Sequence, residues 1–207
     1  MTDKRTGILY IVSAPSGAGK TTLCKMAVDW FPGLRHSVSY TTRQPRPGEA
    51  NGVEYWFVDD GAFDAMIRKG EFLEYAWVFG KRYGTSRKDL ERLAAEGADV
   101  LLEIDVQGAA KVRDAISGGA YIFILPPSIE ACRERLRARG KDGPEEIDRR
   151  LNEAVAEIRK ALDYGYVIIN DDLQTAFEEL KAVIVSERVK RERTEARVRA
   201  IFGAYMG

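Results

Sequence analysis

Residues 8–22 read Ile-Leu-Tyr-Ile-Val-Ser-Ala-Pro-Ser-Gly-Ala-Gly-Lys-Thr-Thr, an apolar run that leads directly into a glycine-rich turn. The run predicts a buried strand, and the apolar spacing after Lys20 predicts a helix. Small residues at Gly17, Ala18 and Gly19 let backbone N–H groups converge on a phosphate, which the positive end of the following helix also attracts. This stretch therefore predicts a phosphate-binding loop (P-loop) in a nucleotide-binding α/β fold.

The loop departs from the pattern G-x-x-x-x-G-K-[ST] at its first position, which is Ala14. Alanine disfavours a positive-φ turn there but leaves the later N–H donors in place. A chance Gly-Lys in an ordinary strand–turn–helix is the alternative, and the flanking strand and helix favour nucleoside triphosphate binding. We expect Lys20 to reach the β- and γ-phosphates and the Thr21 hydroxyl to ligate Mg²⁺. The expected ATP-binding residues here are Ala14, Pro15, Ser16, Gly17, Ala18, Gly19, Lys20, Thr21 and Thr22.

Composition argues against several classes of protein. The 207 residues include 32 lysines and arginines and 32 aspartates and glutamates, so nothing suggests a polybasic nucleic-acid or membrane binder. No apolar run approaches the roughly 20 residues of a membrane span, and no secretory leader precedes the first strand. Two distant cysteines, Cys24 and Cys132, and the single His36 make a disulfide or zinc site unexpected. We expect a reduced, cytoplasmic enzyme with no nucleic-acid or membrane partner.

Short apolar runs alternate with helical periods along most of the chain. Strands are predicted at 8–13, 99–104, 120–125 and 166–169. Helices are predicted at 20–30, 107–117, 129–138 and 173–199. This alternation predicts a parallel sheet with helices on both faces and a ligand site beyond the carboxyl ends of its strands. The P-loop lies at such an end, as do residues 103–105 and 170–172.

Two segments interrupt this rhythm. Residues 35–85 combine short alternating runs, a helical stretch near 61–69 and many glycines and prolines, which predicts an antiparallel insertion. Residues 133–150 place six arginines around a Gly-Lys-Asp-Gly-Pro centre, which predicts a mobile helical lid. The expected division is a P-loop core of residues 1–34, 86–132 and 151–207, the insertion 35–85, and the lid 133–150.

The insertion suggests a second anion site. Residues 37–55 read Ser-Val-Ser-Tyr-Thr-Thr-Arg-Gln-Pro-Arg-Pro-Gly-Glu-Ala-Asn-Gly-Val-Glu-Tyr. The prolines stiffen an extended backbone and hold Arg43 and Arg46 toward one point. Fork-shaped guanidinium groups suit a phosphate, and the hydroxyls of Tyr55 and Tyr83 would complete the cage. From these residues alone, a solvated basic turn is an equally good interpretation.

The same segment resembles the signature of the guanylate kinases, which phosphorylate GMP to GDP with ATP. That signature is Ser-Val-Ser-x-Thr-Thr-Arg-x-Pro-Arg-x-Gly-Glu-x-x-Gly-x-x-Tyr, and residues 37–55 fill it. The similarity covers essentially residues 7–190 and continues through 71–74, 83–85, 103–108, 125–128 and 169–172. It implies a P-loop NTPase-type core with an inserted mixed α/β region that binds GMP. It also implies transfer of the γ-phosphoryl group of ATP to GMP or dGMP, in purine nucleotide metabolism and GMP recycling.

The resemblance assigns roles in the insertion. It implies that the two arginines and two tyrosines named above grip the GMP phosphate, and that Glu74 accepts the N1–H and N2 amino group of guanine. Adenine lacks those two donors, so a carboxylate there discriminates between the bases. Ser39 and Thr85, a serine in some relatives, face the O6/N7 side, and Asp105 lies near the base and metal. The implied GMP-binding residues are Ser39, Arg43, Arg46, Tyr55, Glu74, Tyr83, Thr85, Glu103 and Asp105.

On the donor side, the resemblance implies that lid arginines close over the ATP phosphates. Asn170 and Asp171 would lie beside the adenine and ribose of ATP, although a helix cap at Asp171 or Asp172 is an equally good interpretation. Mg²⁺ is expected on Thr21, ATP phosphates and water. The implied catalytic residues are Lys20, Arg43, Arg135, Arg139 and Arg150.

Two rival functions and one structural question stay open. A scaffold module that binds phosphorylated peptides would lack a working P-loop, whereas Gly17, Gly19 and Lys20 are present here. A kinase for another nucleotide or a sugar phosphate would not need Glu74. The charged stretch 186–199 predicts a solvated helix, and whether the protein is a monomer or a homo-oligomer is undecided.

Overall fold

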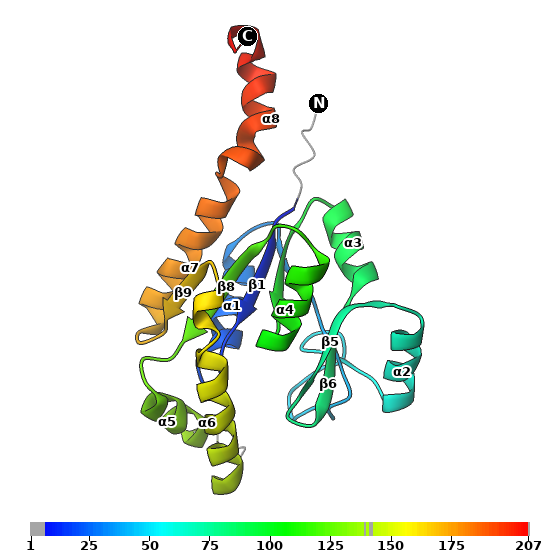
Figure 1. Ribbon diagram of the computed structural model, residues 1–207, viewed down its shortest axis with the longest axis vertical. Coiled ribbons are helices and arrows are strands. Elements are labelled where there is room, and N and C mark those ends of the chain that lie inside the picture. The colour runs from blue at the N-terminus through cyan, green and yellow to red at the C-terminus, as the bar shows by residue number, and fades with distance from the viewer. Residues whose placement is uncertain (1–6, 139, 141–142, 207) are drawn as a thin grey trace.

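The computed structural model describes residues 7–138, 140 and 143–206 (Figure 1). A five-stranded sheet forms the core in the order β2-β7-β1-β8-β9, and every neighbouring pair is parallel. Its strands are β1 Leu9–Ser13, β2 Leu34–His36, β7 Asp99–Glu103, β8 Ala120–Leu125 and β9 Tyr166–Ile169. The predicted parallel α/β core is therefore confirmed, with strand β2 continuing past the expected boundary at residue 34.

Helices cover both faces of this sheet (Figure 1). Side chains alternate across a strand, so Tyr10 and Val12 pack on one face and Ile11 on the other. Helices α1 (Lys20–Trp30) and α7 (Leu173–Arg188) supply the first of these clusters. Helices α3 (Arg87–Ala95) and α4 (Val106–Ala115) supply the second. Burial on both sides fixes the carboxyl ends of the strands as one rigid edge.

The insertion forms a second sheet in the order β4-β3-β6-β5. Its elements are β3 Tyr40–Thr41, β4 Trp56–Phe57, α2 Asp60–Arg68, β5 Phe72–Val78 and β6 Lys81–Ser86. Strands β5, β6 and β3 pair antiparallel as predicted, whereas β3 and β4 pair in parallel. Phe63 of α2 is fully buried and packs its ring 4.6 Å from that of Phe72, which fastens the helix to the sheet.

Two helices occupy the region of the predicted lid. They are α5 (Ile129–Ala138) and α6 (Pro144–Ile158), joined by a cluster of Cys132, Leu136, Ile147 and Leu151. Helix α6 starts with proline, which suits its first turn, and runs past residue 150 because its apolar spacing continues. The lid arginine Arg139 lies outside the described residues.

The C-terminal part contains the turn η1 (Ala161–Asp163) and two helices instead of one. The predicted helix 173–199 is wrong in its continuity, because α7 ends at Arg188 and α8 (Arg191–Phe202) begins after an extended Lys190. Lys190 ion-pairs at 2.6 Å with the buried carboxylate of Glu187, which accompanies the break. Helix α8, followed by η2 (Gly203–Tyr205), buries no residue and projects from the body (Figure 1).

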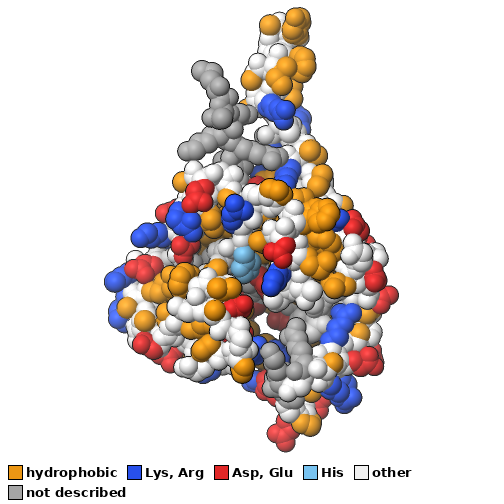
Figure 2. Space-filling view, turned by 180° about the vertical axis from the view of Figure 1, so that it is seen from behind, with side chains coloured by type: hydrophobic (Ala, Val, Ile, Leu, Met, Phe, Trp, Pro, Cys, Tyr) orange, Lys and Arg blue, Asp and Glu red, His pale blue; other side chains and the backbone are white. Residues whose placement is uncertain are grey.

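Charges are mixed on the face of the molecule that Figure 2 shows. Figure 2 shows Lys and Arg side chains interspersed with Asp and Glu, without a field of one sign. Within the described part of the chain, no helix combines the length and apolar character needed to cross a membrane.

Candidate active site

The P-loop connects β1 to α1 with a geometry that requires glycine. Gly17 and Gly19 have φ of 85° and 90°, which side chains rarely adopt. A Cβ on Gly19 would also lie 2.3 Å from Nδ2 of Asn170, and one on Gly17 would lie 3.1 Å from the Cys132 carbonyl oxygen. No side chain caps the start of α1, so the first N–H groups of the helix face the loop. The predicted residues 14–22 thus form one potential anion cradle.

Lys20 and Thr21 connect this loop to the end of strand β7. The Lys20 ammonium donates to the Ile104 carbonyl at 3.1 Å, and the Thr21 hydroxyl donates to the Glu103 carboxylate at 2.5 Å. Burial raises the pKa of Glu103, but His36, Lys20 and Thr21 together bring that pKa below its ordinary value. Glu103, which was predicted to bind GMP, is consequently an ionised carboxylate beside the P-loop lysine.

A residue that follows β9 and a residue of α5 lie beside the P-loop. The amide of Asn170 donates to the Ala18 carbonyl at 2.7 Å, and Arg135 donates to the Asn170 carbonyl at 2.9 Å. The structure thus brings Asn170 and Arg135 to the P-loop. Asp171 is exposed, and the helix cap belongs to Asp172, whose carboxylate accepts from the Thr175 N–H at 2.8 Å.

A cluster of aromatic and charged side chains lies in the insertion. The Arg43 guanidinium sits 5.3 Å from the ring centre of Tyr55, which packs against Tyr83 with ring centres 5.6 Å apart. Glu49 ion-pairs with Arg43 at 2.9 Å and accepts the Arg46 N–H at 2.8 Å, while Arg46 itself is exposed. Burial raises the pKa of Glu49, yet these two contacts bring it below its ordinary value. The sequence prediction missed Glu49, although it stands within the quoted signature.

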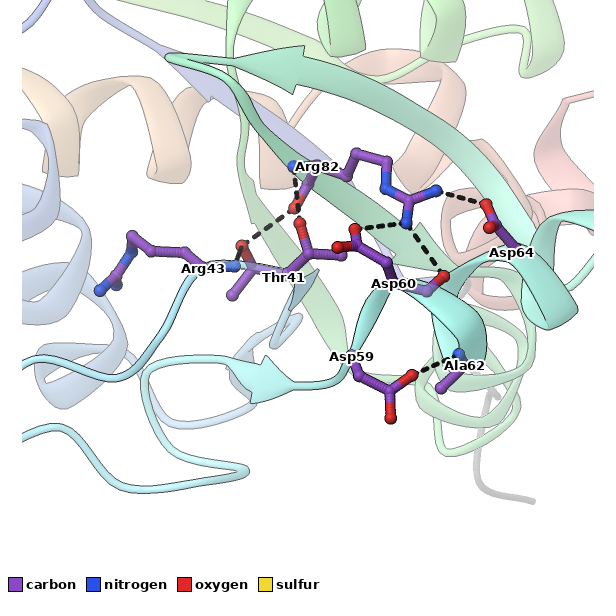
Figure 3. A network of polar contacts seen from close by, with 8 residues as sticks. Thr41, Arg43, Asp59, Asp60, Ala62, Asp64 and Arg82 are labelled. Carbon is purple, nitrogen blue, oxygen red and sulfur yellow. Dashed lines mark hydrogen bonds and ion pairs between the residues drawn. The ribbon is translucent and has the colours of Figure 1, made fainter.

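A buried hydroxyl fixes the backbone of this cluster (Figure 3). Thr41 is fully buried, donates to the Arg82 carbonyl at 2.9 Å and accepts the Arg43 N–H at 3.1 Å. The Arg82 guanidinium in turn ion-pairs with Asp60 and Asp64 of α2, and Figure 3 shows both contacts on one side of strand β6. Thr41 therefore ties Arg43 to the strand that carries Tyr83.

Glu74 closes the other end of the insertion site. It lies on strand β5 and is only 6% exposed. The Thr85 hydroxyl donates to it at 2.6 Å, and burial, opposed by Thr85 and assisted by nearby Asp105, raises the pKa of Glu74 to about 7. Asp105 caps α4 through the Gly108 N–H at 2.9 Å, and a Cβ on Gly108 would lie 2.8 Å from the Glu74 carboxylate. Glycine there leaves room for the carboxylate.

The end of strand β7 interacts both with the P-loop and with the aromatic and charged cluster of the insertion. Glu103 interacts electrostatically with Lys20 of the P-loop and with Tyr55 of the insertion. From the part of α6 beyond the predicted lid, Glu157 interacts with Lys20 and Asp105, and burial raises the pKa of Glu157 to about 7. Figure 2 shows the surface hollowed between the insertion and the lid. No local motif marks Glu157, which is why the sequence did not reveal it.

Ser39 is the remaining predicted residue of the insertion. It is buried beside β3, and its carbonyl accepts the Trp56 N–H at 2.9 Å. Arg150 lies on α6, where its guanidinium is 4.9 Å from the ring centre of Phe79. Arg139 lies outside the described residues. The other predicted residues come from the P-loop, the ends of strands β7 and β9, the insertion, the start of α4, and helices α5 and α6.

Phosphoryl transfer between two bound phosphates is the chemistry that such paired anion sites serve. A P-loop core with an acceptor insertion on one side and an arginine-bearing helical pair on the other is the arrangement of a nucleoside monophosphate kinase.

Comparisons with known proteins identify the particular family. The guanylate kinase family model matches residues 6–187. A guanylate kinase of Geobacter metallireducens is 54% identical over 90% of this chain and 92% of its own. One of Geobacter sulfurreducens is 53% identical over 96% and 98%. The crystal structure of guanylate kinase from Anaplasma phagocytophilum matches with a TM-score of 0.79, 32% identity and 96% coverage of both chains. The chain belongs to the guanylate kinase family, and its activity is phosphoryl transfer from ATP to GMP.

Proposed function

We propose that this chain phosphorylates GMP and dGMP in the cytoplasm, and that Glu74 selects guanine. The observation that carries the proposal is the buried Glu74 carboxylate, held by the Thr85 hydroxyl at 2.6 Å in the insertion that also contains the Arg43 cluster. An ionised carboxylate accepts two hydrogen bonds and offers none, which matches the N1–H and N2 donors of guanine. AMP offers neither donor and would bury that carboxylate with its remaining acceptor positions unsatisfied, so the site would reject AMP.

The phosphate of GMP would bind Arg43, Arg46, Tyr55 and Tyr83. Arg43 is already oriented by the rings beneath it and by Glu49. Because the second pKa of a phosphate monoester is about 6, the acceptor oxygen is mostly deprotonated at neutral pH and needs no general base. That oxygen attacks the γ-phosphorus while the bond to the β–γ bridging oxygen breaks, so GDP forms and ADP leaves. Holding two anions in line is then the main task of the protein.

Charge compensation would come from both sides of the cleft. Lys20 and the P-loop N–H groups would bind the ATP phosphates, with Arg135 and Arg150 over the transferring group. Asn170 and Asp171 would flank the adenosine. Of these, Arg135 and Asn170 contact each other beside the loop. Closure of the lid over the insertion would exclude water, which otherwise competes as an acceptor.

A magnesium ion fits the donor side. The Thr21 hydroxyl and the Glu103 carboxylate are hard oxygen donors that lie together beside Lys20. The described residues contain no cluster of three or more metal-binding side chains, and Mg²⁺ characteristically takes few protein ligands besides phosphates and water. Thr21 would hold the ion directly and Glu103 would orient its shell. When bound, Mg²⁺ neutralises charge that develops on the phosphates.

An assay that measures ADP release with GMP, dGMP, AMP or UMP as the acceptor tests the proposal. The wild-type protein should use GMP and dGMP and reject the others. Glu74→Gln should lower kcat/KM for GMP about a hundredfold, since an amide donor then faces the guanine donors. Glu71→Gln, on the same segment with a 44% exposed side chain, is the matched control and should behave like wild type. If Glu74→Gln used GMP normally and still rejected AMP, another group would select the base.

A further inference from the structure

The turn between β5 and β6 contains an unusual residue. Phe79 has a φ of 50° and Gly80 a φ of 69°, in a two-residue connection closed by the pair Val78–Lys81. Such turns require positive φ at both positions and therefore favour Asn-Gly. In the described chain Phe79 is the only non-glycine residue with positive φ. A phenylalanine with this backbone conformation costs conformational energy, so we expect its ring to make a contact that favours it at this position.

The ring of Phe79 contacts the lid. It is half-buried, and its centre lies 4.9 Å from Cζ of Arg150 and 5.6 Å from Cζ of Arg149. Both arginines belong to α6, whereas Phe79 belongs to the insertion. Guanidinium groups are attracted to the face of an aromatic ring at such distances. The tip of the hairpin therefore meets the lid across the cleft.

The hairpin that carries Phe79 is fixed to the core. The Gln107 amide donates to the Trp77 carbonyl at 3.3 Å, and the Lys111 ammonium donates to the Tyr75 carbonyl. Both donors lie on α4, which follows β7 and its carboxylates. The same two strands carry Glu74 and Tyr83, residues of the proposed acceptor site. A contact between the lid and the tip of this hairpin therefore fixes the position of the lid relative to the acceptor site.

We propose that Phe79 is a positioning residue that holds Arg150 of the lid in register with the acceptor site. This inference rests on the proposed role of Arg150 at the transferring phosphoryl group. Phe79 touches neither substrate in this proposal. The ring of Phe79 restricts the conformations of the Arg150 side chain. When the cleft closes, the Arg150 guanidinium is therefore already oriented toward the GMP phosphate. The contacts of the ring with the two guanidinium groups offset part of the energy cost of the left-handed backbone.

The variant Phe79→Asn separates this role from a structural one. Asparagine suits the turn better but removes the ring, so the hairpin should fold and the melting temperature should stay close to that of wild type. We expect kcat to fall about fivefold to thirtyfold, which corresponds to a loss of ~1 to ~2 kcal/mol. The KM for GMP should change less than about twofold, because the acceptor residues are untouched. Phe79→Tyr keeps the ring and should restore kcat.

A double-mutant cycle identifies the partner of Phe79. Arg150→Ala should lower kcat, and adding Phe79→Asn to it should cause little further loss. Arg149→Ala, which removes the other guanidinium near the ring, should keep kcat near wild type. If Arg150→Ala leaves kcat unchanged, the proposed role of Arg150 fails and this inference fails with it. If Arg150→Ala is impaired but Phe79→Asn is active or its effect is fully additive, only the inference is overturned. A large fall in melting temperature of Phe79→Asn would also overturn it, because the ring would then be structural.

Discussion

Binding of GMP should weaken as the pH falls through neutrality, because Glu74 must be ionised to accept the guanine donors. Burial raises the pKa of Glu74 to about 7 in the ligand-free protein, with Asp105, Lys111 and Thr85 as its neighbours. At that pKa, about nine-tenths of the molecules carry an ionised Glu74 at about pH 8 and about one-tenth at about pH 6. Apparent affinity for GMP should therefore drop about tenfold over that range, and binding should release a proton.

Steady-state KM values for GMP and ATP across this range provide the assay. The second ionisation of the GMP phosphate near pH ~6 contributes only about a twofold change in dianion. Glu157 also has a pKa raised to about 7 by burial, so it titrates in the same range. Glu74→Gln retains both of these groups and lacks only the carboxylate. The ratio of the two pH profiles therefore isolates Glu74.

Between about pH 8 and about pH 6, the KM for GMP should rise about tenfold more in the wild-type protein than in Glu74→Gln. The sign follows from the raised pKa, since the protonated form dominates below it and cannot accept both guanine donors. Identical profiles for the two proteins would show that ionisation of Glu74 does not control GMP binding. A wild-type KM for GMP that fell with falling pH would exclude an ionised Glu74 as the acceptor of the guanine donors.

Lys20→Ala should lower kcat by about a thousandfold or more while the melting temperature is preserved, and near-normal turnover would exclude its role at the phosphates. Arg43→Ala should raise KM for GMP much more than KM for ATP, so equal losses for both substrates would contradict separate donor and acceptor sites. Thr41→Val leaves the Arg43 N–H without its acceptor and removes one of two donors to the Arg82 carbonyl, which keeps the Thr42 N–H; this change should destabilise the fold by about 1–3 kcal/mol and raise KM for GMP. Thr41→Ser keeps the hydroxyl and should retain most of the wild-type stability and KM. A valine variant with wild-type stability and KM would show that the Thr41 hydroxyl does not position Arg43.

The core was predictable because local pattern and burial agree there. Residues 8–13 alternate between two covered faces, and the glycines after them occupy the positive-φ positions that the phosphate loop requires. The resemblance to guanylate kinases, based on residues 37–55, supplied the family and the substrate. Neither inference depends on contacts between distant segments.

Features created by tertiary contacts were not predictable. The break at Lys190 accompanies an ion pair with Glu187, whose burial depends on the packing of α7. Glu157 reaches the P-loop only because α6 folds back over it, and besides residues of α6 its charged neighbours are Lys20 and Asp105, which are distant in the sequence. The ring of Phe79 meets Arg150 across the cleft, far along the chain. Periodicity and motif spacing contain no information about such contacts between residues that are distant in the sequence.

A crystal structure with GMP and a non-hydrolysable ATP analogue would show directly where both substrates bind. We predict guanine N1 and N2 within about 3 Å of the Glu74 carboxylate, the GMP phosphate on Arg43, and the γ-phosphate on Lys20, in line with the acceptor oxygen. A guanine base bound away from Glu74, or two phosphates held too far apart for attack, would contradict the proposed mechanism.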